Sequence, residues 1–132
     1  SGPARTAGPT RTVLLVDDSP FFREMLTPVL KAAGYRVASA GGAEEALGLL
    51  RSGLKVDVLV TDVDMPGRSG FDLVEAARGL KGFEALPVVA LSSGVTGEAV
   101  EKARRLGIAE FVAKFDRSGL IAALADTQDG FR

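Results

Sequence analysis

Four charged residues follow three apolar segments of the chain. Asp17 and Asp18 come directly after VLLV, Asp62 comes after VLVT, and Lys114 comes after FVA. Each apolar run is typical of a buried strand, so each charge is expected at the carboxyl end of a strand. In an open parallel sheet these ends open into one crevice, where ligands bind. Three carboxylates in one crevice repel one another unless a cation or protons intervene, so the pattern predicts a divalent metal, with Lys114 facing a bound anion.

Mg2+ suits such a site better than a metal that prefers nitrogen or sulfur, because it binds carboxylate oxygens, retained waters and phosphate oxygens. Either of the neighbours Asp17 and Asp18 can bind it directly and the other through water. The carboxylate of Asp62 can attack phosphorus and form an acyl phosphate once the nearby negative charge is neutralised. Ser92, which ends the run VVAL, can donate a hydrogen bond to a phosphoryl oxygen, and Lys114 can pair with another.

Each of these residues also has a purely structural interpretation. An aspartate pair after a strand commonly caps a helix, and Asp62 alone could cap a turn. A single lysine such as Lys114 is more often a solvated surface residue. The site is favoured because the residues fall together at the ends of the first, third, fourth and fifth expected strands. A chance distribution would scatter them over both edges of the sheet.

Composition excludes several classes of function. The chain has 132 residues, 46% of them hydrophobic, and a formal net charge of -1, which indicates one domain without a basic surface for nucleic acid or a polybasic membrane patch. It contains no cysteine and no histidine. Disulfides, a zinc cluster, a histidine base and a phosphohistidine on this segment are therefore excluded. Since no apolar run approaches the about 20 residues of a spanning helix, we expect a soluble, cytoplasmic segment without membrane contact.

Short apolar runs alternate five times with amphipathic stretches. Strands are expected at residues 12–16, 36–39, 56–61, 87–91 and 110–113, and helices at residues 20–33, 43–51, 70–78, 96–106 and 119–125. Ser19 as N-cap, Pro20 at the first helical position and Gly34 after the last turn mark both ends of the first helix. The third and fourth strands are continuously apolar, which is typical of strands covered on both faces. The sequence predicts an α/β fold, a doubly wound parallel sheet with right-handed crossovers.

The segments VLLVDDSPFFREML, LVTDVDMPGRSGFDLV, LPVVALSS and EFVAKFD resemble the receiver domain of two-component response regulators. The resemblance implies a single flavodoxin-like (βα)5 domain with sheet order 2-1-3-4-5, spanning residues 12–126. Residues 1–11 are expected to be a linker or residues foreign to the domain, and residues 127–132 a C-terminal tail.

The resemblance also assigns roles to the charged residues. Asp62 is the implied phosphoacceptor and Lys114 the lysine that pairs with the phosphoryl group. Mg2+ is the implied cofactor, bound by Asp17, Asp18, the Asp62 carboxylate and the backbone carbonyl of Asp64. The phosphodonor would be the phosphohistidine of a histidine kinase. The domain would catalyse only its own phosphorylation and dephosphorylation, so it is not expected to be an enzyme in its own right.

A switch is implied as well. Ser92 would move toward the phosphoryl group, and Phe111 would rotate into the space that Ser92 vacates; a fixed core position for Phe111 is the alternative. The expected output face is formed by the fourth helix, the fifth strand and the fifth helix. Its candidate contacts with a downstream or intramolecular protein partner are Lys102, Arg105 and Arg117.

Two features depart from the family pattern. Phe115 follows Lys114, where the family has a proline with a cis bond. A cis bond before phenylalanine would cost about 3 kcal/mol, so a trans bond and a rearranged loop around Asp116 are expected. Asp64 and Gly94 hold the positions that line the path of the hydrolytic water in receivers, and Asp64 adds a negative charge there.

The parent protein and the class of function leave alternatives open. The ending KFDRSGL resembles receivers at the C-terminus of chemotaxis-type hybrid histidine kinases, and a free-standing single-domain regulator is the rival. A phosphohydrolase with an aspartate nucleophile would also need a second acid, for which Asp64 has the spacing, and a covering cap. A flavin carrier of the same fold is disfavoured, because Asp17 and Asp18 would repel a flavin phosphate.

Overall fold

The computed structural model describes residues 10–129. Five strands alternate with five helices in the order β1 (Thr12–Val16), α1 (Pro20–Ala32), β2 (Arg36–Ala40), α2 (Ala43–Arg51), β3 (Val58–Asp62), α3 (Gly70–Arg78), β4 (Val88–Ser92), α4 (Gly97–Arg105), β5 (Glu110–Ala113) and α5 (Arg117–Asp129). All paired strands are parallel, and the sheet order is β2-β1-β3-β4-β5. The predicted doubly wound fold and its strand order are therefore confirmed. In the described part of the chain, no helix is both long and apolar enough to cross a membrane.

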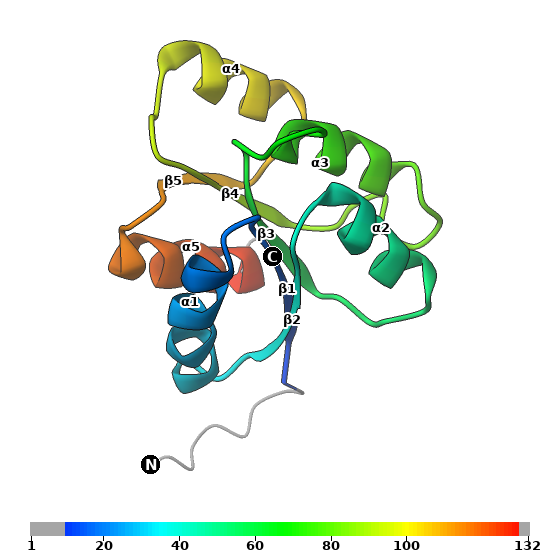
Figure 1. Ribbon diagram of the computed structural model, residues 1–132, viewed down its shortest axis with the longest axis vertical. Coiled ribbons are helices and arrows are strands. Elements are labelled where there is room, and N and C mark those ends of the chain that lie inside the picture. Colours follow the sequence, from blue (N-terminus) through cyan, green and yellow to red (C-terminus); the bar gives the residue numbers. More distant parts are fainter. Residues whose placement is uncertain (1–9, 130–132) are drawn as a thin grey trace.

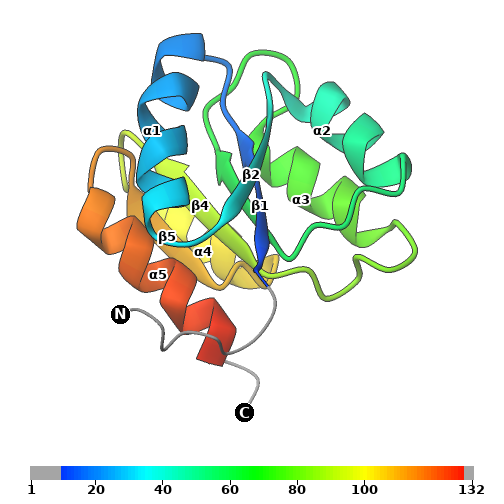
Figure 2. The ribbon, with the colours of Figure 1, turned by 90° about the horizontal axis from the view of Figure 1, so that it is seen from below.

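The sheet separates two layers of helices. Helices α1 and α5 cover one face, while α2, α3 and α4 cover the other (Figures 1 and 2). Successive residues of a strand point to opposite faces, so Leu14 packs in the core beneath α2 and α3 while Leu15 packs beneath α1 and α5. Every residue of β3 and β4 is buried, which explains the continuous apolar runs at residues 58–60 and 88–91 in these two strands.

Helix α1 begins at the predicted residue, Pro20, and ends at Ala32, one residue before the predicted end. The hydroxyl oxygen of Ser19 accepts a hydrogen bond from the backbone N–H of Phe22 at 3.2 Å, and Pro20 occupies the first helical turn. Gly34 follows the helix with a φ of +101°, a conformation that other residues rarely adopt. The buried residues Phe22, Leu26 and Leu30 are spaced four apart on the face toward the sheet. The first of them, Phe22, therefore lies near the edge of the sheet where β1 ends.

The last helix is longer than predicted. α5 runs from Arg117 to Asp129, whereas the sequence indicated residues 119–125. The carboxylate of Asp116 accepts a hydrogen bond from the backbone N–H of Gly119 at 2.9 Å, so the helix begins at an aspartate cap ahead of the glycine. Residues 127–129 continue this helix, while residues 1–9 and 130–132 of the expected linker and tail lie outside the described residues. Within the expected linker, Arg11 donates a hydrogen bond to the hydroxyl of Thr127 at 3.2 Å.

Candidate functional site

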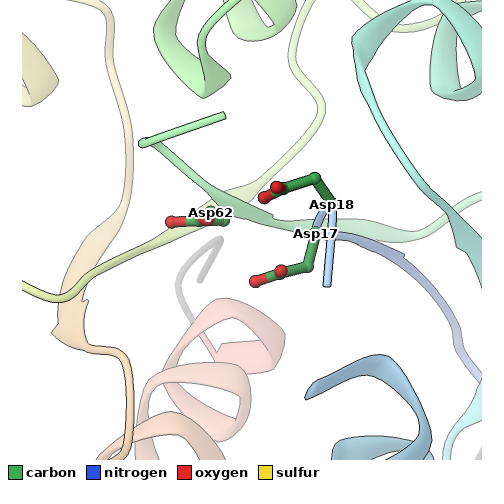
Figure 3. A group of neighbouring side chains, drawn as sticks. All are labelled: Asp17, Asp18 and Asp62. Atoms are coloured by element: carbon green, nitrogen blue, oxygen red, sulfur yellow. The ribbon is translucent and has the colours of Figure 1, made fainter. Parts of the chain in front are cut away.

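The residues singled out from the sequence meet at one edge of the sheet. Asp17 and Asp18 directly follow β1, Asp62 and Ser92 are the last residues of β3 and β4, and Lys114 directly follows β5. Because all paired strands are parallel, their carboxyl ends lie along the same edge. The side chains of Asp17, Asp18 and Asp62 reach into the same space there (Figure 3), with one oxygen of each within 4.8 Å of the others.

Lys114 bridges two of these carboxylates. Its Nζ lies 3.0 Å from Oδ2 of Asp17 and 3.3 Å from Oδ2 of Asp62, and the two aspartates are 0% and 2% exposed. Burial alone lowers the pKa of Lys114, but the hydrogen bonds and negative charges of Asp17 and Asp62 outweigh it and raise the pKa above its ordinary value. The ammonium is therefore firmly protonated at neutral pH.

The surroundings of Asp62, taken together, disfavour the charged form of its carboxylate. Burial raises its pKa most, the backbone N–H of Asp64 lowers it through a 3.2 Å hydrogen bond, and the charge of Asp17 raises it again. Lys114 lowers it, but the net result is a pKa above the ordinary value. One lysine thus does not offset burial and repulsion, and the cluster has capacity for a further cation.

The unsatisfied groups fit a hard divalent cation. Oδ1 of Asp17 accepts a hydrogen bond from the backbone N–H of Ser19 at 2.8 Å. Oδ2 is fully buried, and its polar partner is the ammonium of Lys114 at 3.0 Å. Asp18 is exposed and Asp62 is buried, so the three carboxylates offer oxygen ligands and one open side for water or phosphate, as Mg2+ requires. The Asp64 backbone carbonyl stays a predicted further ligand.

Ser92 is buried at the end of β4, the strand next to that of Asp62, and its hydroxyl has three polar contacts. Its hydroxyl lies 2.9 Å from the carbonyl oxygen of Gly94 and 3.3 Å from Oδ2 of Asp64, and it accepts the backbone N–H of Gly94 at 3.1 Å. One hydroxyl proton can serve only one of the two acceptors at a time. The side chain of Asp64 is thus turned toward Ser92, while its N–H binds Asp62. Phe111 is half-buried and pairs in register with Ala90, and its rotation stays a prediction.

Helix α3 begins in direct contact with the backbone of Asp62. Ser69 and Asp72 form a reciprocal capping box, and the backbone N–H of Gly70 donates to the carbonyl of Val63 at 3.2 Å. A Cβ atom at Gly70 would lie 2.3 Å from the carbonyl oxygen of Asp62. Only glycine lets the helix start this close to the end of β3.

The contacts of Phe22 with Lys114 and Phe115 were not predicted from the sequence. Nζ of Lys114 lies over the ring of Phe22, 4.7 Å from its centroid. The rings of Phe22 and Phe115 form a T-shaped pair with centroids 5.7 Å apart. The signal for Phe22 was its place as the first apolar residue of the α1 face, next to the end of β1. The Lys114–Phe115 bond is trans, as predicted.

The expected output face carries exposed cations. Lys102, Arg105 and Arg117 are all exposed on α4 and α5. Nζ of Lys102 lies over the ring of Phe71 on α3 at 5.1 Å, and Arg105 pairs with Glu101 at 3.7 Å. Two of the three cations therefore already make contacts within the chain, and their role toward a partner stays a prediction.

Solved structures of response regulators have the same fold as this chain. The chemotaxis response regulator CheY4 of Vibrio cholerae is 30% identical with a TM-score of 0.84, over 90% of this chain and 99% of that chain. The response regulator TrrA of Thermotoga maritima, crystallised in complex with Mg2+ and BeF, is 28% identical with a TM-score of 0.78, over 89% and 99% of the two chains.

Sequence comparison gives the same assignment. The sensory/regulatory protein RpfC of Xanthomonas campestris is 34% identical over 117 residues, which are 87% of this chain. The chain spans only 16% of the length of that relative. The family model of the response regulator receiver domain matches residues 13–125. The chain therefore belongs to the family of response regulator receiver domains.

Proposed function

We propose that the domain accepts a phosphoryl group on Asp62 from the phosphohistidine of a histidine kinase, with Mg2+ held by Asp17, Asp18 and Asp62. The observation that carries this proposal is the geometry of Asp62, a 2% exposed carboxylate 3.3 Å from Lys114 and within 4.8 Å of two other carboxylates. The complex of TrrA with Mg2+ and BeF supports a metal in the same fold.

In the transfer step, an Asp62 carboxylate oxygen forms a bond to phosphorus while the P–N bond to the donor imidazole breaks. The electron pair of that bond stays on the nitrogen, and the other ring nitrogen of the donor carries a proton, so the leaving group is neutral imidazole. A metal ion held by Asp17, Asp18 and Asp62 would offset the negative charge of the carboxylates and of the incoming phosphoryl group. Lys114 pairs with a phosphoryl oxygen, and its contact with Asp17 at 3.0 Å keeps the ammonium in place before the donor arrives.

Phosphorylation would then act on Ser92. Its hydroxyl would turn away from Gly94 and Asp64 and donate to a phosphoryl oxygen, which is charged and therefore a stronger acceptor than the neutral carbonyl of Gly94. The space opened beside β4 would admit the ring of Phe111 and bias the face of α4, β5 and α5 toward a partner-binding state. Catalysis is confined to the domain's own phosphorylation and dephosphorylation.

We further propose that the receiver acts within a hybrid histidine kinase of the chemotaxis type. The long relative RpfC, of which this chain matches 16%, supports a receiver embedded in a larger signalling protein. The alternative is a free-standing regulator, since CheY4 is matched over 99% of its chain. Phosphotransfer to the receiver from candidate kinases, measured with and without the rest of the parent protein, would decide between the two.

The experiment for Asp62 is intact mass spectrometry after treatment with acetyl phosphate, with and without Mg2+. The proposal predicts a Mg2+-dependent gain of one phosphoryl group, absent in Asp62→Asn and retained in the control Asp126→Asn, whose side chain is exposed on α5. A phosphoryl group retained in Asp62→Asn would contradict the assignment. Repeated turnover of small phosphomonoesters would instead favour a phosphohydrolase.

A further inference from the structure

The ammonium group of Lys114 rests on an aromatic ring. Its Nζ lies 4.7 Å from the ring centroid of Phe22, within the distance at which a cation is attracted by the face of a ring. The Phe22 side chain is 2% exposed, and the backbone N–H of Phe22 is fixed by the Ser19 cap. The ring is therefore a rigid surface of α1 on which the lysine lies, and no water separates the two at this distance.

The loop after β5 fits this arrangement. The backbone N–H of Lys114 donates to the carbonyl of Ser92 at 2.9 Å, and the N–H of Asp116 donates to the carbonyl of Ala113 at 3.0 Å. These bonds close a turn around Lys114 and Phe115. Phe115 is 70% exposed, yet its ring contacts Phe22 in a T-shaped pair. Phe22 thus contacts both residues of the turn that replaces the proline turn of the family.

The three partners of the ammonium change differently during phosphorylation. Two are the carboxylates of Asp17 and Asp62, and Asp62 loses its carboxylate charge when it forms the mixed-anhydride bond to phosphorus. The attraction of the Asp62 carboxylate for Lys114 therefore weakens as the reaction proceeds. The third partner, the ring of Phe22, is neutral and takes no part in the reaction, so its attraction stays constant.

We propose that Phe22 is a positioning residue for phosphoryl transfer. Its ring holds the Lys114 ammonium, by a cation–π interaction, where the ammonium can contact the phosphoryl group on Asp62. This inference rests on the proposed phosphorylation of Asp62. A residue that only fills the core would need the shape of phenylalanine but not the electron density of its face. Shape and electron density can be varied separately, which makes the proposal testable.

The test replaces Phe22 by phenylalanines with one, two and three ring fluorines, which keep the size of the ring and withdraw electrons from its face. Positioning through the ring predicts a stepwise fall in the initial rate of phosphorylation by acetyl phosphate with Mg2+, to about one tenth with three fluorines, at nearly constant Tm. The same substitutions at Phe83, which packs against the core under α2 and α3, should leave the rate unchanged.

A second measurement does not depend on activity. The ring current of Phe22 should shift the NMR signals of the Lys114 side-chain methylene protons upfield. Phe22→Leu should abolish this shift, and Phe22→Tyr, which keeps an aromatic face, should retain both the shift and most of the rate. A constant rate across the fluorinated series, in a protein whose native form is phosphorylated, would overturn the positioning role alone. A native protein without phosphorylation would overturn the proposed function together with it.

Discussion

A methyl group added at Gly70 should disturb the end of β3 at Asp62. An ideal Cβ at this position lies 2.3 Å from the carbonyl oxygen of Asp62, 2.8 Å from Cα of Val63 and 3.0 Å from the carbonyl carbon of Asp62. Ordinary contacts of a Cβ atom are 3.4–4 Å. All three neighbours are backbone atoms, so no side-chain rotation relieves the clash. The start of α3 must move away from β3 in Gly70→Ala.

The size of the effect follows from three contributions. Overpacking a fixed contact costs about 1–3 kcal/mol, and the upper end applies where backbone must shift. The movement also strains the hydrogen bond from Gly70 to Val63, which measures 3.2 Å and is worth about 1 kcal/mol. Against this, alanine is better than glycine in a helix by about 1 kcal/mol. We expect a net loss of about 2–3 kcal/mol in the free energy of unfolding, or a fall in Tm of about 10 °C.

The chain offers a matched control in Gly48, an exposed residue within α2. No heavy atom lies within 4 Å of a Cβ built there, so Gly48→Ala should raise the free energy of unfolding by about 0.5–1 kcal/mol. Urea denaturation followed by circular dichroism measures both variants. Equal effects of Gly70→Ala and Gly48→Ala would refute the close approach of α3 to Asp62. If α3 does lie this close to Asp62, Gly70→Ala should also slow phosphorylation, since it displaces the backbone of Asp62.

Three further predictions concern the charges and the first helix. In Mg2+-free buffer at pH 7, Asp62→Asn should raise the free energy of unfolding on the order of 1 kcal/mol, because it removes a buried charge beside Asp17. Because the pKa of Asp62 is raised, this gain in stability should fade as the pH falls through that pKa toward the ordinary value of 3.8, since the Asp62 carboxyl of the native protein then becomes neutral, as the amide of the Asp62→Asn variant is. A gain in stability that persists in acid would contradict this reasoning. Mg2+ at about 100 times its dissociation constant should stabilise the native protein by about 2.7 kcal/mol in thermal melts, and Asp17→Asn should lose most of that gain. Ser19→Ala should cost about 1 kcal/mol in urea denaturation through loss of the α1 cap, and no change in stability would show that the cap is dispensable.

The fold was predictable because the features that determine it, buried strands and capped helices, can be recognised in short segments of the sequence. A strand covered on both faces is apolar along most of its length. The runs at residues 58–60 and 88–91, just ahead of Asp62 and Ser92, show this pattern, so β3 and β4 were located within two residues. Parallel topology then places every strand end on one edge. The meeting of Asp17, Asp18 and Asp62 therefore followed from the order of strands and helices, without knowledge of any side-chain contact.

What the sequence did not reveal depends on contacts between distant segments or on single caps. The cation–π contact of Phe22 with Lys114 joins the first helix to the last loop, and no local pattern encodes such a pair. The start of α5 was placed two residues too late, at Gly119, because Asp116 was expected in a loop, whereas its carboxylate caps the helix. The hydrogen-bond partners of the Ser92 hydroxyl, Asp64 and Gly94, depend on the conformation of two loops, which the spacing of residues in the sequence does not determine.

The hydrogen bond between Arg11 and Thr127 bears on how the domain can be tethered. Arg11 also reaches the carbonyl oxygen of Asp57, just before β3, at 3.5 Å, so the beginning of β1 and the last turn of α5 meet at the amino-terminal edge of the sheet. The cluster of Asp17, Asp18 and Asp62 lies at the opposite, carboxyl-terminal edge. A neighbouring domain joined next to either of these segments would thus be attached at the amino-terminal edge of the sheet, away from the carboxylate cluster.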